Sequence, residues 1–242
     1  MSLDALLDLV FPSRCAACHL RVRPGLDWCE ACTATFVSAF EHACLRCGRI
    51  HLEGGVAHLC SHCIKAPSPP PWTRSAFAYG GALQQVLSRW KNLPDEALGA
   101  PLGALAANAF AASDEVRTLV ADSPSIVLTS VPSRASALIR RAFNPASILA
   151  RRVARRLDLR YRPRALELAI EGEGTKGQGR RARLERVRGH MRGCARWLGG
   201  CDVIVVDDVI TTGATMAEAA RACLEAGARR VFGLALARVP EP

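Results

Sequence analysis

No run of apolar residues in this 242-residue sequence is long enough to cross a membrane. A membrane-spanning helix needs about 18 to 20 such residues, and an alanine-rich stretch, residues 97–112, is interrupted by Pro101 and Asn108. The N-terminal residues include Asp4 and Asp8 and no basic segment ahead of an apolar one, unlike a secretory signal. These absences predict a cytoplasmic protein with no membrane insertion.

Two common phosphate-binding loops are also missing. The sequence contains no GxxxxGK[ST], and its GxGxxG pattern, GEGTKG at 172–177, lies in a glycine-rich stretch that opens no predicted helix. The usual nucleoside-triphosphate and dinucleotide folds therefore lack their phosphate loop here. Aromatic residues make up only 5% of the chain, whereas proteins that grip single-stranded nucleic acid depend on aromatic stacking. Trp72, Trp90 and Trp197 are candidates for stacking, but we expect at least two of them to lie in the core.

Positive charge is concentrated in one part of the chain. The formal net charge is +10, from 32 basic and 22 acidic residues, yet residues 134–196 alone contain 18 Lys and Arg against 5 Asp and Glu. Such a local field favours phosphate-rich partners, either small molecules or nucleic acid. Charge alone does not distinguish between them.

Eight of the eleven cysteines form four Cys-x-x-Cys pairs near the start of the chain. They are Cys15, Cys18, Cys29, Cys32, Cys44, Cys47, Cys60 and Cys63. Ten residues separate the first two pairs and twelve the last two, a spacing typical of tetrahedral four-thiolate zinc sites. The pattern predicts two structural zinc ions that stabilise a module with little core of its own. The spacing leaves two pairings open, either sequential or first with third and second with fourth.

The remaining sequence predicts an α/β domain. Four prolines in residues 67–71 indicate a stiff linker, residues 67–72, between a zinc-ribbon-like module, residues 1–66, and a larger domain, residues 73–242. Continuously apolar strands alternate with helices, which favours a parallel sheet covered on both faces. The expected strands are 75–79, 125–130, 166–169, 203–206 and 230–238, and the expected helices are 82–91, 96–112, 144–157 and 215–227.

An acidic pair and the loop after it form the most informative stretch. Residues 203–206 should bring the chain to the carboxyl edge of the sheet, where ligands of open α/β folds bind, and Asp207 and Asp208 follow directly. Carboxylates there can accept hydrogen bonds from a sugar diol, and residues 211–215 offer the hydroxyls and backbone N–H groups of a phosphate cradle. Ribose 5-phosphate satisfies both. Two other interpretations of the stretch remain open. The acids and threonines could be an ordinary strand end and helix cap that bind no ligand, or the apolar run that ends in two Asp could be the Walker B pattern of ATPases.

The stretch VIVVDDVITTGAT resembles the phosphoribosyl-pyrophosphate (PRPP) motif of type I phosphoribosyltransferases at all thirteen positions. From Cys15 to Arg238 the chain also resembles the ComF family of bacterial competence proteins, in which cysteine-pair zinc modules precede a phosphoribosyltransferase domain. The supporting segments are the cysteine pairs, RWK at 89–91, SVPSR and RRAFN within 130–144, and ERVRG at 185–189. The resemblance implies a type I phosphoribosyltransferase fold, a parallel sheet flanked by helices, after a small zinc-binding module.

The same resemblance assigns roles to individual residues. Asp207 and Asp208 would be catalytic and hold the ribose hydroxyls, and Mg²⁺ would accompany PRPP. The 5-phosphate would bind Thr211, Thr212, Gly213, Ala214 and Thr215. The loop from Val131 to Arg134, with Ser133 and Arg134, would meet the pyrophosphate. The glycine-rich loop 171–189 would form a hood over the site, with Lys176, Arg180 and Arg181 as electrostatic partners.

Two segments depart from the family pattern. The usual Arg-Gly-Phe-Asn-Gln is here Arg141-Ala142-Phe143-Asn144-Pro145, and the usual Asn before Val-Arg-Gly is Arg186. Both departures concern positions outside the PRPP motif.

Two functions are consistent with these patterns. The first is a phosphoribosyltransferase-family protein of natural transformation, in which a nucleophile displaces pyrophosphate from PRPP; no base pocket is recognisable, so the acceptor stays open. The second is a competence factor that binds single-stranded DNA, alongside partners such as a helicase, and retains PRPP as a sensor ligand or relic. Its DNA surface would include four arginines of one helix, Arg151, Arg152, Arg155 and Arg156.

Overall fold

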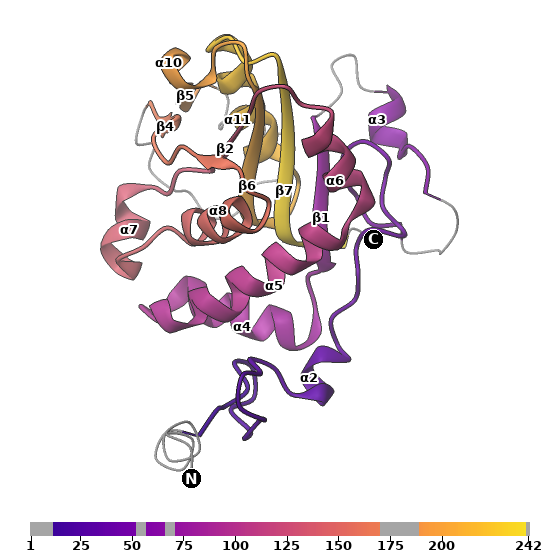
Figure 1. The fold of residues 1–242 in the computed structure, drawn as a ribbon, viewed down its shortest axis with the longest axis vertical. Helices are drawn as coiled ribbons and strands as arrows, with labels where there is room; N and C mark the ends of the chain where they lie inside the picture. The colour runs from indigo at the N-terminus through magenta and orange to yellow at the C-terminus, as the bar shows by residue number, and fades with distance from the viewer. Residues whose placement is uncertain (1–11, 52–56, 66–70, 170–188, 241–242) are drawn as a thin grey trace.

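The computed structural model describes residues 12–51, 57–65, 71–169 and 189–240. Its centre is a five-stranded sheet in the order β1-β7-β6-β2-β3, with every neighbouring pair parallel (Figure 1). The strands are β1 (Trp72–Ala78), β2 (Ile126–Ser130), β3 (Arg160–Tyr161), β6 (Asp202–Ile210) and β7 (Arg230–Arg238). A parallel sheet flanked by helices confirms the predicted fold class.

Helices cover both faces of this sheet. The larger elements are α4 (Gly81–Asn92), η1 (Glu96–Leu98), α5 (Gly99–Ala112), α6 (Asp114–Ala121), α7 (Ala135–Arg141), α8 (Pro145–Arg156) and α11 (Ala214–Glu225), and α10 (Ala195–Leu198) is a single turn. A small antiparallel pair, β4 (Leu166–Leu168) and β5 (Met191–Gly193), packs against α11. None of the helices among the described residues is both long and apolar enough to span a membrane.

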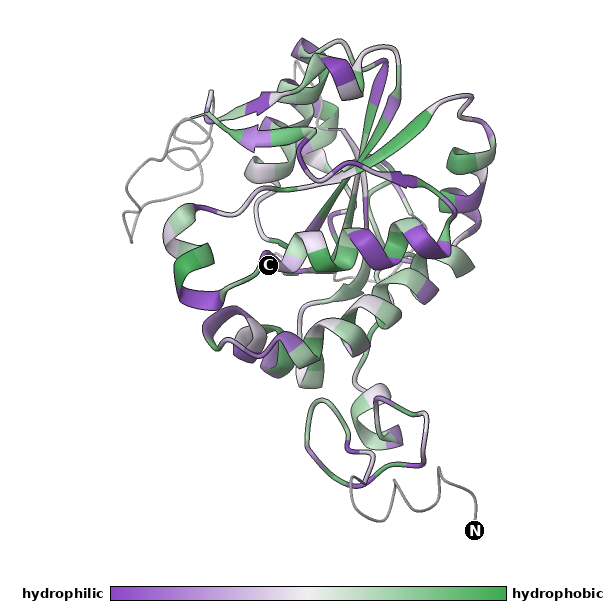
Figure 2. Ribbon diagram, turned by 60° about the vertical axis from the view of Figure 1, so that its left-hand side comes forward, coloured by the Kyte–Doolittle hydropathy of each residue, from purple (hydrophilic) through white to green (hydrophobic). Residues whose placement is uncertain are grey.

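The continuous apolar run of β6 serves two cores. Successive strand side chains point to opposite faces, so Ile204 and Val206 lie in the core with α4, α5 and α8, whereas Val203 and Val205 lie in the core with α11. All four are fully buried. Figure 2 shows hydrophobic residues concentrated along the central strands and mixed with hydrophilic ones along the helices. This two-sided burial is why the strand has no polar alternation.

The tryptophans are less buried than expected. Trp90 is fully buried, but Trp72 and Trp197 are half-buried at the edges of the two cores. The guanidinium of Arg74 lies 4.5 Å from the ring centroid of Trp72, and that of Arg162 lies 4.4 Å from that of Trp197. The expectation of two core tryptophans was therefore wrong, because strand β1 and the turn α10 place these rings at the rim.

The cysteine segment docks onto the domain at two separate places (Figure 1). Its first half, with α2 (Glu30–Thr33), lies against α4. Its second half, with α3 (Ser61–Lys65), lies beside β1, where Arg74 donates hydrogen bonds to the carbonyls of Cys44 (3.3 Å) and Leu45 (3.1 Å). Residues 37–39, between the halves, bond to residues 76–78 of β1 and so cover an edge strand that would otherwise be open.

Most of the proline-rich linker lies outside the described residues, but the structure shows where it ends. Strand β1 begins at Trp72, inside the predicted linker range. Its pairing with β7 starts at the register Trp72↔Phe232. The first strand therefore starts three residues earlier than residue 75, where the apolar pattern placed it.

Candidate functional site

Strand β6 extends past its neighbour β2 at the carboxyl edge of the sheet. Pairing with β2 ends at Ser130↔Val206, whereas pairing with β7 continues from Asp207↔Ala235 to Ile210↔Arg238. The predicted end of this strand at residue 206 was therefore wrong, because β7 supports it for four more residues. The acidic pair consequently lies on a strand held along one flank and open along the other.

Both carboxylates of the pair are largely buried. Asp207 and Asp208 are each 9% exposed. The Asp207 Oδ1 accepts a hydrogen bond from the backbone N–H of Asp208 (2.8 Å), and the Asp208 Oδ1 accepts one from the N–H of Val209 (2.6 Å). Burial, followed by the neighbouring charge of Asp208, raises the pKa of Asp207 to about 7. The pair can thus accept hydrogen bonds from hydroxyls, and one of its members titrates near neutrality.

Two cations approach Asp208 from other elements. The Lys91 Nζ, on α4, lies 2.9 Å from the Asp208 Oδ1, and the Lys91 side chain is 32% exposed. Arg141, the last residue of α7, is buried; its burial lowers its pKa, and the charge of Asp208 opposes that shift. Neither was predicted as a site residue. The sequence pointed to these two residues only indirectly, because Lys91 lies in the RWK segment and Arg141 in the RRAFN segment that carry the family resemblance.

The loop after β6 has the form of an anion cradle. Thr211 and Thr212 precede Gly213, whose φ of +81° favours glycine, and α11 begins at Ala214. The Thr212 Oγ1 accepts a long hydrogen bond from the Ala214 N–H (3.4 Å). Residues 211–215, predicted to hold a phosphate, therefore form the turn into a twelve-residue helix, and the first N–H groups of a helix have no partner within it.

The loop after β2 lies beside the same edge. The Val131 N–H donates to the Val206 carbonyl (2.9 Å), and Val131 is buried. The Asn144 side chain donates to the Val131 carbonyl (2.9 Å) and accepts from the Ala146 N–H (3.0 Å), so it fixes this loop and caps α8. Ser133 is half-buried and Arg134 exposed at the start of α7. The structure thus brings both predicted pyrophosphate residues to the edge that carries the acidic pair.

One departure from the family pattern falls on a strained backbone position. Ala142 ends α7 with φ +67°, a left-handed conformation that glycine adopts without strain and alanine does not. The glycine of the family pattern would adopt this backbone conformation without strain.

The predicted hood lies mostly outside the described residues. Lys176, Arg180, Arg181 and Arg186 fall in residues 170–188, so their roles stay predictions. At the end of this segment the Met191 N–H donates to the buried carboxylate of Glu218 (3.1 Å), which also accepts from Arg221 (2.7 and 2.8 Å). Glu218 therefore fastens β5 to α11, close to the cradle loop.

The eight paired cysteines form two four-sulfur groups. Cys15, Cys18, Cys29 and Cys32 make one group and Cys44, Cys47, Cys60 and Cys63 the other, with the ligand atoms of each within 4.8 Å of one another. The pairing is therefore sequential, and the interleaved alternative is wrong. Each group has the donor number and type of a structural zinc site.

The electrostatics of both groups suit a bound cation. Burial favours a neutral thiol, but backbone hydrogen bonds outweigh it and lower the pKa of Cys15 and of Cys44 to about 6. Burial, with hydrogen bonds and charge from neighbouring sulfurs, raises the pKa of Cys32 and of Cys63. Four thiolates so close together need a cation to be charged at once, and zinc supplies that charge.

Comparison with known proteins agrees with this arrangement. Residues 6–64 match the double zinc ribbon domain family. The chain is 28% identical over 214 residues to competence protein ComFC of Bacillus subtilis (strain 168), covering 85% of this chain and 81% of that one. It is 26% identical over 228 residues to DNA utilization protein YhgH of Escherichia coli O6:H1 (strain CFT073), covering 92% and 96%.

Two further matches are shorter or weaker. A stretch of 39 residues is 56% identical to ribose-phosphate pyrophosphokinase of Sulfurisphaera tokodaii, but it covers only 16% of this chain and 13% of that enzyme. The structure of glutamine phosphoribosylpyrophosphate (PRPP) amidotransferase from B. subtilis superposes with a TM-score of 0.35 at 21% identity, covering 64% of this chain and 28% of that one.

The sheet topology and the two cysteine groups define an α/β protein, with a parallel sheet flanked by helices, that carries a double-zinc-ribbon segment. Along most of its length, the chain is ComFC-like.

Proposed function

We propose that this protein binds PRPP, together with Mg²⁺, at the carboxyl edge of the sheet. The observation that carries the proposal is the pair of buried carboxylates on the open flank of β6, followed at once by the cradle loop into α11. Asp207 and Asp208 accept hydrogen bonds from the ribose hydroxyls, residues 211–215 hold the 5-phosphate, and Ser133 and Arg134 contact the pyrophosphate.

The chemistry that follows is transfer of the phosphoribosyl group. A nucleophile attacks the anomeric carbon, and the C–O bond to pyrophosphate breaks. Mg²⁺ bound with PRPP would neutralise pyrophosphate charge. Arg134, exposed beside the site, stabilises the departing anion, and the buried carboxylates orient the sugar.

The names of the full-length relatives, a competence protein and a DNA utilization protein, support a role in the handling of DNA during natural transformation. The cysteines are grouped as metal ligands rather than as disulfides, which supports a location in the reducing cytoplasm.

Isothermal titration of the zinc-loaded protein with PRPP and Mg²⁺ tests the site. The double variant Asp207→Asn, Asp208→Asn should lose binding by at least about tenfold, since each charge-assisted hydrogen bond contributes about 1.5 to 3 kcal/mol. The matched control is Asp114→Asn, Asp122→Asn, which removes two exposed acids at the two ends of α6. Equal affinity in the double variant and the wild type would rule out this site.

A second candidate is contact with single-stranded DNA. The observation that favours it is the outer face of α8, where Arg151, Arg152, Arg155 and Arg156 are all exposed and make no ion pair within the described residues. Replacing all four by glutamine should weaken a single-stranded DNA gel shift and reduce its salt dependence. An unchanged affinity and salt slope would exclude this surface.

A further inference from the structure

Three consecutive residues of α4 point to three different parts of the molecule. Each helical residue turns by about 100° relative to the last, so Arg89, Trp90 and Lys91 leave the helix in distinct directions. Arg89 reaches the first cysteine group, Trp90 enters the core, and Lys91 reaches the acidic pair. A single helical turn thus touches the zinc module and the candidate PRPP site at once.

Arg89 binds the turn that presents the first two cysteines. Its Nη2 donates to the carbonyl of Ala16 (2.5 Å), and its Nη1 lies 2.8 Å from the Nε2 of His19. Ala16 lies between Cys15 and Cys18, and the N–H of His19 bonds to the carbonyl of Cys15 (2.9 Å). The Arg89 guanidinium therefore hydrogen-bonds to the backbone of the metal-binding turn rather than to a cysteine sulfur.

Trp90 fixes the rotation of α4 about its axis. Its side chain is fully buried and stacks on Phe143, with ring centroids 5.6 Å apart and an interplanar angle of 29°. Phe143 belongs to the segment that follows Arg141 and Ala142, so the stack also ties α4 to the end of α7. The buried stack thus fixes the turn of α4 that carries both Arg89 and Lys91.

We propose that Lys91 is a positioning residue of the acidic pair, held in place through α4 by the contact of Arg89 with the first zinc-binding turn. The proposal rests on the proposed PRPP site for its functional consequence. Lys91 offsets the charge of Asp208 and holds that carboxylate in one orientation. The first cysteine group, once it holds its metal, thereby supports the affinity of the acidic-pair site through α4.

The charge around Lys91 supports this role. Two adjacent carboxylates, each 9% exposed, repel one another, and Lys91 is the ammonium that pairs with one of them. Its charge also opposes the burial-driven rise in the pKa of Asp207. Without Lys91 the pair would bind a proton more readily and would accept hydrogen bonds from a ribose diol less well.

A double-mutant cycle separates this coupling from a local structural effect. The PRPP affinity is measured for the wild type, Arg89→Met, Lys91→Met and the double variant, all zinc-loaded. Lys91→Met should bind PRPP about tenfold more weakly and Arg89→Met about threefold more weakly. The double variant should bind no more weakly than Lys91→Met alone, because Arg89 acts through Lys91. Additive losses, or normal affinity in Arg89→Met, would overturn the proposal.

Two controls accompany the cycle. Lys91→Arg keeps the charge and should stay within about twofold of the wild-type affinity. Arg117→Met removes an exposed arginine on α6 whose ion pair, in the described part of the chain, is with Asp114 and not with the acidic pair. This variant should leave PRPP affinity unchanged.

A measurement without ligand distinguishes failure of this coupling from failure of the proposed function. The ammonium ¹⁵N resonance of Lys91, assigned by its loss in Lys91→Met, should be sharp in the wild type and broadened in Arg89→Met. That result, in a protein that does not bind PRPP, would uphold the coupling and reject the function. A Lys91 signal that Arg89→Met leaves unchanged would reject the coupling whether or not PRPP binds.

Discussion

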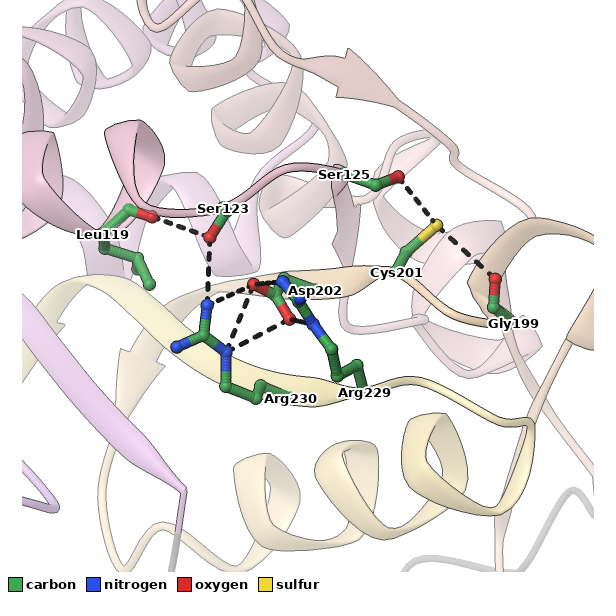
Figure 3. A network of polar contacts seen from close by, with 8 residues as sticks. All are labelled: Leu119, Ser123, Ser125, Gly199, Cys201, Asp202, Arg229 and Arg230. Atoms are coloured by element: carbon green, nitrogen blue, oxygen red, sulfur yellow. Dashed lines mark hydrogen bonds and ion pairs between the residues drawn. The ribbon is translucent and has the colours of Figure 1, made fainter.

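Replacing Asp202 by asparagine would remove the least exposed ion-paired carboxylate in the described part of the protein. Asp202 begins β6 and its side chain is 0% exposed. It accepts hydrogen bonds from Arg229 (2.8 and 2.5 Å) and from Arg230 (3.2, 3.2 and 2.5 Å), as Figure 3 shows. Ser123 extends this network to the end of α6.

The magnitude follows from the geometry. Losing one member of a buried pair costs about 3 to 5 kcal/mol, but the two arginines are 44% and 48% exposed and water screens them. We therefore expect Asp202→Asn to lower the free energy of unfolding by about 2 kcal/mol. For a chain of this size that corresponds to roughly 4 to 8 °C in melting temperature.

Urea denaturation of the zinc-loaded protein between pH 3 and pH 7 measures this effect. Burial by itself would raise the pKa of Asp202, but the hydrogen bonds from Arg229 and Arg230 hold it well below its ordinary range. A depressed pKa stabilises the fold fully above the pKa of an unfolded aspartate, about 3.9, and the stabilisation is lost as the pH falls below that value. The difference between wild type and Asp202→Asn should therefore shrink below pH 4.

The control is Asp114→Asn, which removes an aspartate that is 85% exposed and paired with Arg117 on the same helix. It should change stability by less than about 0.5 kcal/mol. The reasoning would be refuted if Asp202→Asn were as mild as this control, or if its effect were the same at pH 3 and pH 7.

Two further predictions concern the candidate site. Ala142→Gly should raise the free energy of unfolding by about 1 kcal/mol, because it relieves a left-handed alanine at φ +67°; destabilisation in urea would contradict the strain. A ¹³C carboxyl titration should show Asp207 ionising near pH 7, and Asp208→Asn should lower that pKa by removing the neighbouring charge. An unmoved pKa in Asp208→Asn would assign the whole shift to burial.

The sequence predicted those elements whose ends carry local chemical signals. Strand β7 has the bounds that its apolar run indicated, Arg230 to Arg238. Helix α8 starts at Pro145 after the cap of Asn144, as the Asn-Pro pair predicted. In both cases the determinant lies within a few residues of the boundary.

Other features depend on contacts far apart in the chain and could not be predicted in this way. The extension of β6 beyond residue 206 requires β7 beside it. Helix α7 is only seven residues long, with exposed apolar side chains such as Ile139, so its periodicity gave no clear signal. Lys91 reaches Asp208 across 117 positions of sequence, and no local pattern reports such a contact.

The docking of the second cysteine group has a consequence for the order of folding. Arg238, in the last strand, donates a hydrogen bond to the carbonyl of Cys47 (2.9 Å), a separation of 191 residues. Among the residues that the structure describes, β1, onto which that group also docks, pairs within the sheet with β7 alone. During synthesis the second cysteine group emerges before β7, yet the surface that receives this group is complete only when β7 has been made. A chain that stalls before β7 would thus present the second cysteine group without the strand that pairs with β1 and bonds to Cys47.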